Sequence, residues 1–299
     1  MPKATKRKPQ VSIIGTGRIG TALAIARVQQ GYSIGALVTR RRESARRAAA
    51  LLRPFLDAPA PVMGLKELAD PHAPELLLIA TPDDQIAKVA EALAKLDWNA
   101  GHRSIVLHTS GALSSAVLAP LRDKNWITGS LHPLASISEP KAGARLLRGA
   151  FWCVEGDKRA VSLGRTIVAD LDGKSFSITS ENKPLYHAAA VMASGNVTAL
   201  FDLAIEMLSA CGLTRKQAQE ALMPLLASAV RNLEKLDPSR ALTGTFARGD
   251  VETVKRHLEV LKSNKQALEM YRLLGLRSLE LSGSRLEPAV VKQIKRLIG

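Results

Sequence analysis

The feature that most constrains this chain is a glycine motif near its start, GTGRIG at residues 15–20. The motif follows the apolar run at 11–14 and opens a stretch of helical patterning at 21–30. In that context the first glycine permits a tight turn, the second lets the backbone approach phosphates, and the third lets helix and strand pack closely. The helix N-terminus adds free N–H groups. The motif therefore predicts a strand–turn–helix unit that binds the pyrophosphate of a dinucleotide.

The end of the second expected strand indicates which dinucleotide binds. Thr39, Arg40 and Arg41 follow the apolar run at 32–38, where an NAD-specific domain usually offers a carboxylate to the ribose 2′-hydroxyl. A hydroxyl followed by guanidinium groups suits a 2′-phosphate, because arginine forms bidentate, charge-assisted hydrogen bonds to phosphate oxygens. We therefore expect NADP(H). The alternative, above all for Arg42, is a solvated charge cluster at a helix start.

The pattern up to residue 180 is that of a parallel, doubly wound sheet, because short apolar runs alternate with helical stretches. Most of the later runs are continuously apolar, as in strands covered by helices on both faces. These runs lie at 76–80, 104–108, 126–131, 151–155 and 175–178. We expect a mainly parallel α/β Rossmann domain at 11–180, preceded by a basic flexible tail at 1–10.

After residue 180 only helical patterning remains. A first run continues to Gly212, a second from 214 to about 236 contains Pro224 and should kink there, and shorter helices start near 250, 264 and 287. These segments are rich in alanine and leucine, more apolar than a lone small bundle needs. We expect an all-α dimerisation domain at 181–299 that joins two copies into a homodimer.

The net charge of +15 invites a nucleic-acid interpretation, but its distribution argues against specific binding. Four basic residues lie within the first eight positions and five more between 40 and 47, in one tail and one expected phosphate site. Aromatic residues make up only 4% of the chain, so few platforms exist on which single-stranded bases could stack. Weak, non-specific binding to polyanions stays open.

The cysteines and the N-terminus favour a cytoplasmic location. Cys153 and Cys211 are the only cysteines, and we expect both to be buried thiols of a reducing compartment rather than a disulfide or metal ligands. The basic first ten residues are followed by only four apolar ones, unlike a secretory signal. No uninterrupted apolar run approaches the length of a membrane span, so no membrane association is expected.

Ligands of parallel α/β sheets lie beyond the carboxyl ends of the strands, where this chain places polar residues. Thr81 and Pro82 follow one strand and are expected near the nicotinamide ribose; equally, the segment fits a proline-started helix whose Asp83 and Asp84 complement the helix dipole. The candidate cofactor-binding residues are Gly15, Thr16, Gly17, Arg18, Ile19, Gly20, Thr39, Arg40, Arg41, Thr81 and Pro82.

His132 is the sharpest candidate for proton transfer. It follows an expected strand, the adjacent proline restricts its backbone, and imidazole can relay the proton that reduction of C=O or C=N requires. Ser110, after the preceding strand, could orient the histidine or the substrate, or could be a turn residue before Gly111. A capping or packing role is the alternative for His132, and we expect His108 to be structural.

The helical domain supplies three further candidates. His187 and Asn196 are polar groups in a small, apolar helical stretch, so they could line the active-site cleft or simply belong to helix packing. Arg248 lies in a loop before Asp250, a plausible N-cap, and could meet a substrate carboxylate.

Together these segments resemble a Rossmann-type family whose C-terminal helical domain has no assigned function, often labelled deazaflavin-dependent NADP oxidoreductase-like. The resemblance rests on GTGRIG, ATPDDQI, HTSGALSS, SLHPLASI, YHAAAVMASGN and LTGTFARGDVETVKRH, in that order. It implies a Rossmann domain, a helical dimerisation domain and NADP(H) binding, with no established reaction.

More distantly, the chain is similar to prephenate dehydrogenases, in which a serine after one strand pairs with a His-Pro after the next. That resemblance implies that His132 contacts the substrate hydroxyl with Ser110 as its partner. The segment MASGN before a helix also looks like the helical dimer domain of pyrroline-carboxylate reductases, although their Ser-Gly-Pro is absent here.

The preferred hypothesis is an NADP(H)-dependent oxidoreductase that moves hydride to or from a small carbonyl, imine or hydroxy-acid substrate held between the domains. His132 would handle the proton, Ser110 would orient, His187 and Asn196 would bind substrate or nicotinamide, and Arg248 would anchor an anion. The alternatives are a non-enzymatic NADP(H)-binding or redox-sensing protein, and a basic nucleic-acid-associated protein on a Rossmann scaffold.

Overall fold

The structure, a computed structural model, describes residues 7–69, 74–98 and 103–299. The chain divides into two compact units, Met1–Ser194 and Gly195–Gly299. The division falls one helix later than the expected boundary at 180, because the helix α7 (Lys183–Ala193) belongs with the first unit.

The first unit is built on an eight-stranded sheet with the order β3-β2-β1-β4-β5-β6-β7-β8. All neighbouring strands run parallel except β6 and β7, so the expected mainly parallel, doubly wound sheet is confirmed. The strands are β1 (Val11–Ile14), β2 (Ile34–Val38), β3 (Val62–Met63), β4 (Leu76–Ile79), β5 (Ile105–His108), β6 (Ile127–Pro133), β7 (Phe151–Gly156) and β8 (Lys174–Phe176). Strand β3 was not predicted from the sequence, because two residues are too few to show a strand pattern.

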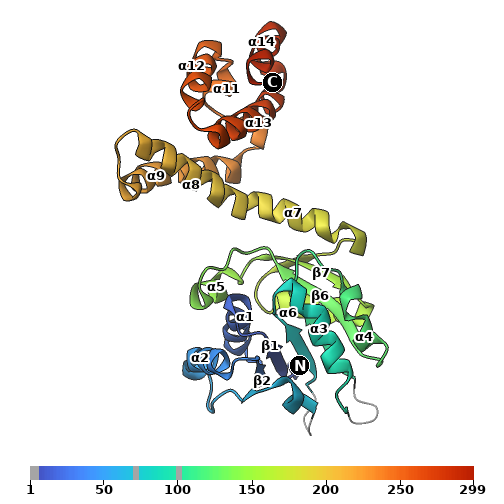
Figure 1. Ribbon diagram of the computed structural model, residues 1–299. Helices are drawn as coiled ribbons and strands as arrows, with labels where there is room; N and C mark the ends of the chain where they lie inside the picture. The colour runs from blue at the N-terminus through green and yellow to red at the C-terminus, as the bar shows by residue number, and fades with distance from the viewer. Residues whose placement is uncertain (1–6, 70–73, 99–102) are drawn as a thin grey trace, which may run out of the picture. The chain divides into compact units, whose positions relative to one another are not determined.

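Helices cover both faces of this sheet (Figure 1), which explains why its central strands are apolar throughout. In β4, Leu76 and Leu78 pack toward one layer while Leu77 and Ile79 pack toward the other. The first layer consists of α1 (Arg18–Gln29), α2 (Arg42–Leu52), α5 (Pro140–Leu146) and α6 (Lys158–Ala169), and the second of α3 (Asp83–Ala94) and α4 (Ala119–Arg122). The order reverses between β1 and β4, so their carboxyl ends diverge there and form the crevice in which such sheets bind ligands.

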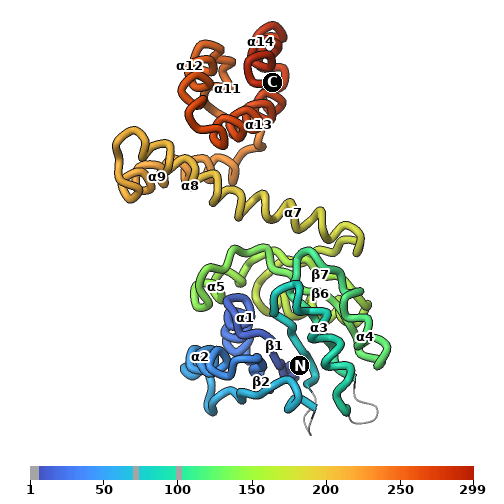
Figure 2. The backbone as a smooth tube through the Cα atoms, viewed as in Figure 1, coloured from blue at the N-terminus to red at the C-terminus, as the bar shows by residue number. Residues whose placement is uncertain are grey.

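The second unit is all helical, as expected, and Figure 2 traces its path. Its helices are α8 (Gly195–Ala210), α9 (Arg215–Lys235), α10 (Pro238–Ala241), α11 (Thr245–Arg248), α12 (Val251–Leu261), α13 (Lys265–Ser282) and α14 (Pro288–Ile298). Side-chain caps explain three of the starts: Thr214 and Gln217 form a capping box on α9, Asn264 caps α13, and Asp250 accepts from the Thr253 amide to cap α12, which confirms its expected role.

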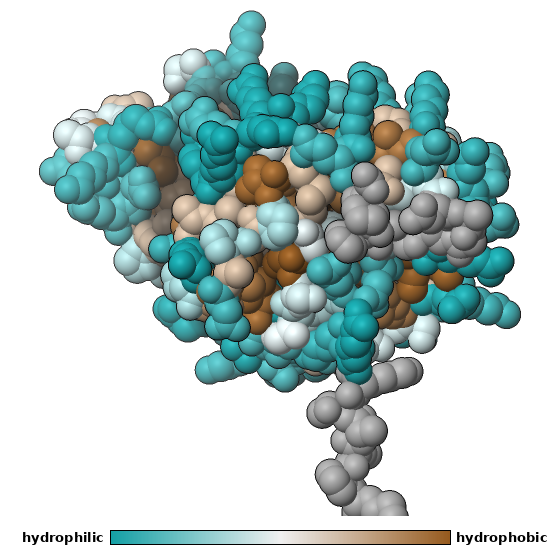
Figure 3. Space-filling view, turned by 90° about the horizontal axis from the view of Figure 1, so that it is seen from below, coloured by the Kyte–Doolittle hydropathy of each residue, from teal (hydrophilic) through white to brown (hydrophobic). Residues whose placement is uncertain are grey.

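Exposed apolar side chains concentrate on the helices from α7 onward. Leu185, Met192, Leu225, Val260 and Leu273 are each more than half exposed. The face seen in Figure 3, by contrast, shows hydrophobic residues in small areas bordered by hydrophilic ones. Cys211 is also exposed, which corrects the expectation that both cysteines are buried; Cys153 is buried in β7.

One helical stretch, Ser180–Ala210, is long and apolar enough by composition to cross a membrane, with a mean hydropathy of 1.5. The sequence analysis did not anticipate this stretch. Here it comprises α7 and α8, separated at Ser194, and little of its surface is buried within the single chain. Length and composition are the only features that mark it as a candidate span.

Candidate functional site

The glycine loop lies between β1 and α1, and its three glycines have different constraints. A Cβ on Gly15 would come within 2.6 Å of the Ala80 carbonyl oxygen, and one on Gly20 would come within 1.8 Å of the Gly15 carbonyl oxygen. Gly15 also has φ +98°, which favours glycine. A Cβ on Gly17 would meet nothing within 4 Å. The first and third glycines are therefore required by the protein's own packing, whereas the second faces open space.

That open space is part of a cavity of about 660 Å³ at the carboxyl ends of β1, β2 and β4. The hydroxyls of Thr16 and Thr81, both lining residues, are buried and have no hydrogen-bond partner in the described parts of the chain. At this loop α1 begins without a side-chain cap or an acidic residue in its first turn, so its first N–H groups remain available to an anion. The cavity therefore fits the pyrophosphate of a dinucleotide.

The basic end of β2 differs in one detail from expectation. Thr39 and Arg40 line the cavity as expected, and Arg42 lines it as well and pairs with Glu67. Arg41 occupies the N-cap of α2 and is not a lining residue. Two arginines therefore line the cavity at the end of β2, and they are Arg40 and Arg42.

Ser110 closes the turn after β5. Its hydroxyl donates to Asp83 at 2.8 Å, and the same oxygen accepts from the amides of Ala112 and Leu113 at 3.2 and 3.0 Å. Asp83 is the first residue of α3, directly after Pro82. Ser110 thus joins the ends of β4 and β5, as in the turn interpretation, and the hydrogen-bond partner of His132 is another residue.

That partner is Tyr186 of α7, whose hydroxyl lies 2.7 Å from His132 Nδ1. The ring of His187 lies 5.5 Å from that of His132, at an interplanar angle of 86°. Both rings reach Gly111, where a Cβ would come within 2.3 Å of His187 Nδ1 and 2.8 Å of His132 Nε2. His132 lies within β6 rather than after it, because pairing with β7 extends the strand through Pro133. The two candidate histidines are therefore brought together.

Below this pair lies a buried network that the sequence analysis missed. Lys183 is fully buried, and its Nζ donates to the Ser110 carbonyl oxygen at 3.0 Å and lies 3.1 Å from Ser130 Oγ. Glu155 accepts hydrogen bonds from Ser115 and Ser180 at 2.7 to 2.8 Å. Burial alone would raise the pKa of Glu155, but these hydrogen bonds and the charge of Lys183 hold it below its ordinary value.

The environment keeps both buried histidines uncharged at neutral pH. Burial, followed by the positive charge of Lys183, lowers the pKa of His132 to about 3. The same two causes lower the pKa of His108 to about 4; its Nδ1 accepts from the Ser110 amide, and its Nε2 lies 3.2 Å from the Ser114 carbonyl oxygen. His108 is structural, as expected. At neutral pH His132 is therefore held as uncharged imidazole.

A second cavity, of about 360 Å³, opens beside His132 and His187. Its remaining walls come from the segment after β6 and from α7, including Leu134, Ser136 and Val191. His187 Nδ1 is buried and has no hydrogen-bond partner among the described residues. This histidine cavity is mostly apolar with two imidazoles at one side, which suits a small substrate with one polar reacting group.

The remaining candidates belong to the second unit. Asn196 is the second residue of α8, and Arg248 is the last residue of α11, two positions before the Asp250 cap. The histidine cavity described above is lined by residues of the first unit.

The sequence did contain a signal for Lys183 and Tyr186, which were not predicted. Together with His187 they have the i, i+3 and i+4 spacing that places side chains on one helix face. Glu155 had no comparable signal, because one acid at the end of an apolar run is commonplace.

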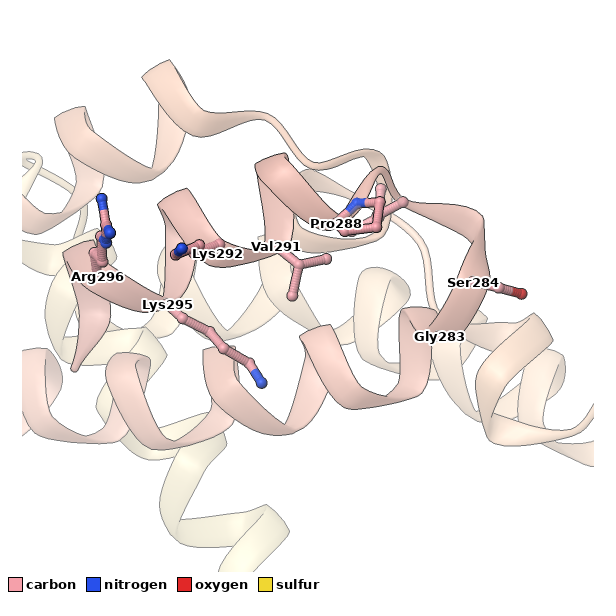
Figure 4. Close-up of a pocket in the computed structure, with 8 residues that line it drawn as sticks. Gly283, Ser284, Pro288, Val291, Lys292, Lys295 and Arg296 are labelled. Atoms are coloured by element: carbon pink, nitrogen blue, oxygen red, sulfur yellow. The ribbon is translucent and has the colours of Figure 1, made fainter.

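A third hollow lies in the second unit, beside α14 (Figure 4). Lys292, Lys295 and Arg296 border it together with Val291 and Pro288, and the close-up shows these side chains on one helix, α14. It is open to solvent, and its lining holds no histidine, cysteine or acidic residue. The two cavities of the first unit are therefore the better candidates.

Comparison with known families agrees with this arrangement. Residues 3–133 match the Rossmann-like domain family, and residues 150–278 match a domain of unknown function, DUF2520. The chain thus combines a Rossmann-like domain with a DUF2520 domain, as the six motifs indicated. No curated protein sequence matches it significantly.

Solved structures show the same fold. A candidate NADP oxidoreductase from Bacteroides fragilis is 20% identical, with a TM-score of 0.72 over 91% of this chain and 98% of the other. A protein from Thermotoga maritima is 25% identical, with a TM-score of 0.70 over 92% and 99%. A Plasmodium falciparum pyrroline carboxylate reductase with NADP bound is 12% identical, with a TM-score of 0.59 over 98% and 99%. The expected likeness to pyrroline-carboxylate reductases and prephenate dehydrogenases is confirmed for the fold.

Proposed function

We propose that this protein is an NADP(H)-dependent oxidoreductase that transfers hydride to or from a small carbonyl, imine or hydroxy-acid substrate. One observation carries the proposal: a glycine-loop cavity with two unpartnered threonine hydroxyls lies at the same edge of the sheet as a half-buried pair of histidines beside a second cavity. The similar structures described as an NADP oxidoreductase and as a reductase with NADP bound support it.

The residues of the glycine-loop cavity would hold the cofactor. The amides of Gly17, Arg18 and Ile19, at the start of α1, would face the pyrophosphate, and the hydroxyls of Thr16 and Thr81 would gain the partners they lack. Arg40 and Arg42 would bind the 2′-phosphate. When bound, the nicotinamide supplies the hydride chemistry; the protein aligns donor and acceptor.

The histidine cavity would hold the substrate. His132, uncharged and bonded to Tyr186 through Nδ1, would offer Nε2 to the reacting oxygen or nitrogen, and His187 would position the same group. Asn196 is a further proposed contact of substrate or nicotinamide, and Arg248 a proposed anchor for an anionic group.

A screen of NADPH oxidation with small ketones, aldehydes, imines and 2-oxo acids tests the activity, paired with calorimetric titration of NADPH. Saturable binding together with turnover of one substrate class supports the proposal. Absence of NADPH binding contradicts it, and binding without turnover across the panel leaves a redox-sensing protein as the better description.

We also propose a homodimer formed through the helices after residue 180, in the cytoplasm. Apolar side chains that a monomer would leave in water support it, among them Leu185, Met192, Leu225 and Leu233, each more than half exposed. Light scattering at micromolar concentration should give twice the monomer mass of 32.1 kDa. A mass of one chain would refute the dimer, and recovery only with detergent would favour a membrane contact of Ser180–Ala210.

A further inference from the structure

Lys183 is a buried cation to which the proposed chemistry assigns no role. It opens α7, its side chain has no exposed surface, and its Nζ contacts the Ser110 carbonyl oxygen and the Ser130 hydroxyl. Lysines are almost never fully buried unless they are paired or serve a function. Ser130 Oγ lies 3.4 Å from Glu155, so the nearest hydrogen-bonded carboxylate is one serine away rather than in direct contact.

The groups that face His132 come from three elements. From α7 come Lys183, Tyr186 and His187; β5 contributes His108, and β7 places Cys153 opposite His132 in register. Glu155 also lies on β7, but its oxygens are occupied by Ser115, Ser130 and Ser180. Among these groups Lys183 has the largest electrostatic effect on His132. Its positive charge disfavours a second proton on the imidazole.

The ring itself is held on two sides. The Tyr186 hydroxyl bonds Nδ1, and the backbone at Gly111 approaches Nε2 so closely that no side chain fits between them. Because the hydrogen bond at one ring nitrogen sets which nitrogen carries the proton, Tyr186 can select the tautomer. The pKa of Tyr186 is raised by burial, so its hydroxyl keeps its proton and can donate it to Nδ1.

We propose that Lys183 is a positioning residue which, with Tyr186, holds His132 as a single neutral tautomer with its proton on Nε2, in the ring that lines the histidine cavity. His132 then acts on a substrate oxygen as a hydrogen-bond donor without net charge, and an imidazolium is not the proton source at neutral pH. The inference deepens the proposed function and rests on it for the reaction, but the charge state can be measured without substrate or cofactor.

The test is nitrogen-15 NMR of the histidine rings in the full-length protein between about pH 2.5 and 8, a range that includes the His132 titration. In the unmodified protein His132 should stay neutral down to about pH 4, with Nε2 protonated. Lys183→Met, which removes the charge but keeps an unbranched buried chain, should raise the His132 pKa by about one unit or more. Lys174→Met is the matched control, because Lys174 lies on β8 with its ammonium group over Phe151, and should leave the pKa unchanged.

Tyr186→Phe tests whether Tyr186 selects the tautomer. This variant should shift the His132 ring toward a mixture of neutral tautomers without adding charge. If Lys183→Met does not fold, Lys183→Gln keeps an uncharged donor for Ser110 and Ser130 and gives the same readout. A His132 pKa in the lysine variant within about 0.3 unit of the unmodified value overturns the inference. NADPH titration of the same samples separates the two failures. If the unmodified protein does not bind NADPH, the proposed function is refuted. If the His132 pKa is unchanged in the Lys183 variant, only the role of Lys183 is refuted.

Discussion

The glycine-loop cavity and the histidine cavity lie at one edge of the same sheet but are built in different ways. The backbone shapes the glycine-loop cavity. Gly15 and Gly20 lie against other backbone atoms, and the loop itself is one continuous segment of the sequence. Side chains of β6, of the segment after it and of α7 shape the second, where the Tyr186 hydroxyl bonds His132 and Lys183 bonds Ser110 and Ser130 nearby. Substitution should therefore damage the fold at the first cavity and the chemistry at the second.

Gly20→Ala should have the largest effect. Its new Cβ would lie 1.8 Å from the Gly15 carbonyl oxygen. Relief of this clash requires a backbone shift, because both the glycine and the atom that it meets belong to the backbone. We expect a loss of about 3 kcal/mol or more in the free energy of unfolding, measured by urea denaturation. Gly17→Ala, whose Cβ meets nothing, should cost less than about 1 kcal/mol yet weaken NADPH binding. Equal destabilisation by the two variants would break the comparison.

His132→Asn should leave the fold intact and lower turnover by at least about a hundredfold once a substrate is known. The asparagine keeps a polar group of similar reach but cannot reproduce the neutral imidazole bonded to Tyr186. NADPH affinity should stay within about threefold, because the cofactor residues lie in the other cavity. If the variant instead unfolds or loses cofactor, with activity per bound cofactor unchanged, His132 is structural and His187 becomes the leading candidate.

The third effect is on the pH dependence of stability. The pKa values of His132 and His108 are lowered in the folded state, to about 3 and about 4, so the unfolded chain binds more protons between these values and about pH 6.5. The stability that each histidine contributes is complete above about pH 6.5 and is lost as the pH falls. His132→Asn should make the decline between pH 6 and 4.5 shallower by about 1.4 kcal/mol per pH unit. Parallel curves for the two proteins would show that His132 is not buried as neutral imidazole.

The same contrast explains what the sequence could reveal. Strands such as β1 and β4 were predictable because their apolar runs are continuous, and the glycine loop because its spacing is contiguous and its context is a strand and a helix. The sequence predicted Arg40 and Arg41 as cofactor contacts, whereas Arg40 and Arg42 line the cavity, since which arginine faces it depends on where α2 begins. Lys183 and Tyr186 were missed because their roles arise only when α7 meets β5 and β6, a contact between residues more than fifty positions apart.

The measurement that tests the central claim most directly is the pair of dissociation constants for NADPH and NADH, from calorimetric titration of the full-length protein. We expect NADPH to bind at least about tenfold more tightly, and Arg40→Ala with Arg42→Ala to remove most of that difference, because both guanidinium groups line the cavity. Arg41 does not line the cavity, so Arg41→Ala is the matched control and should keep the difference between the two dissociation constants. Equal affinity of the unmodified protein for the two dinucleotides, or binding of neither, would contradict the account.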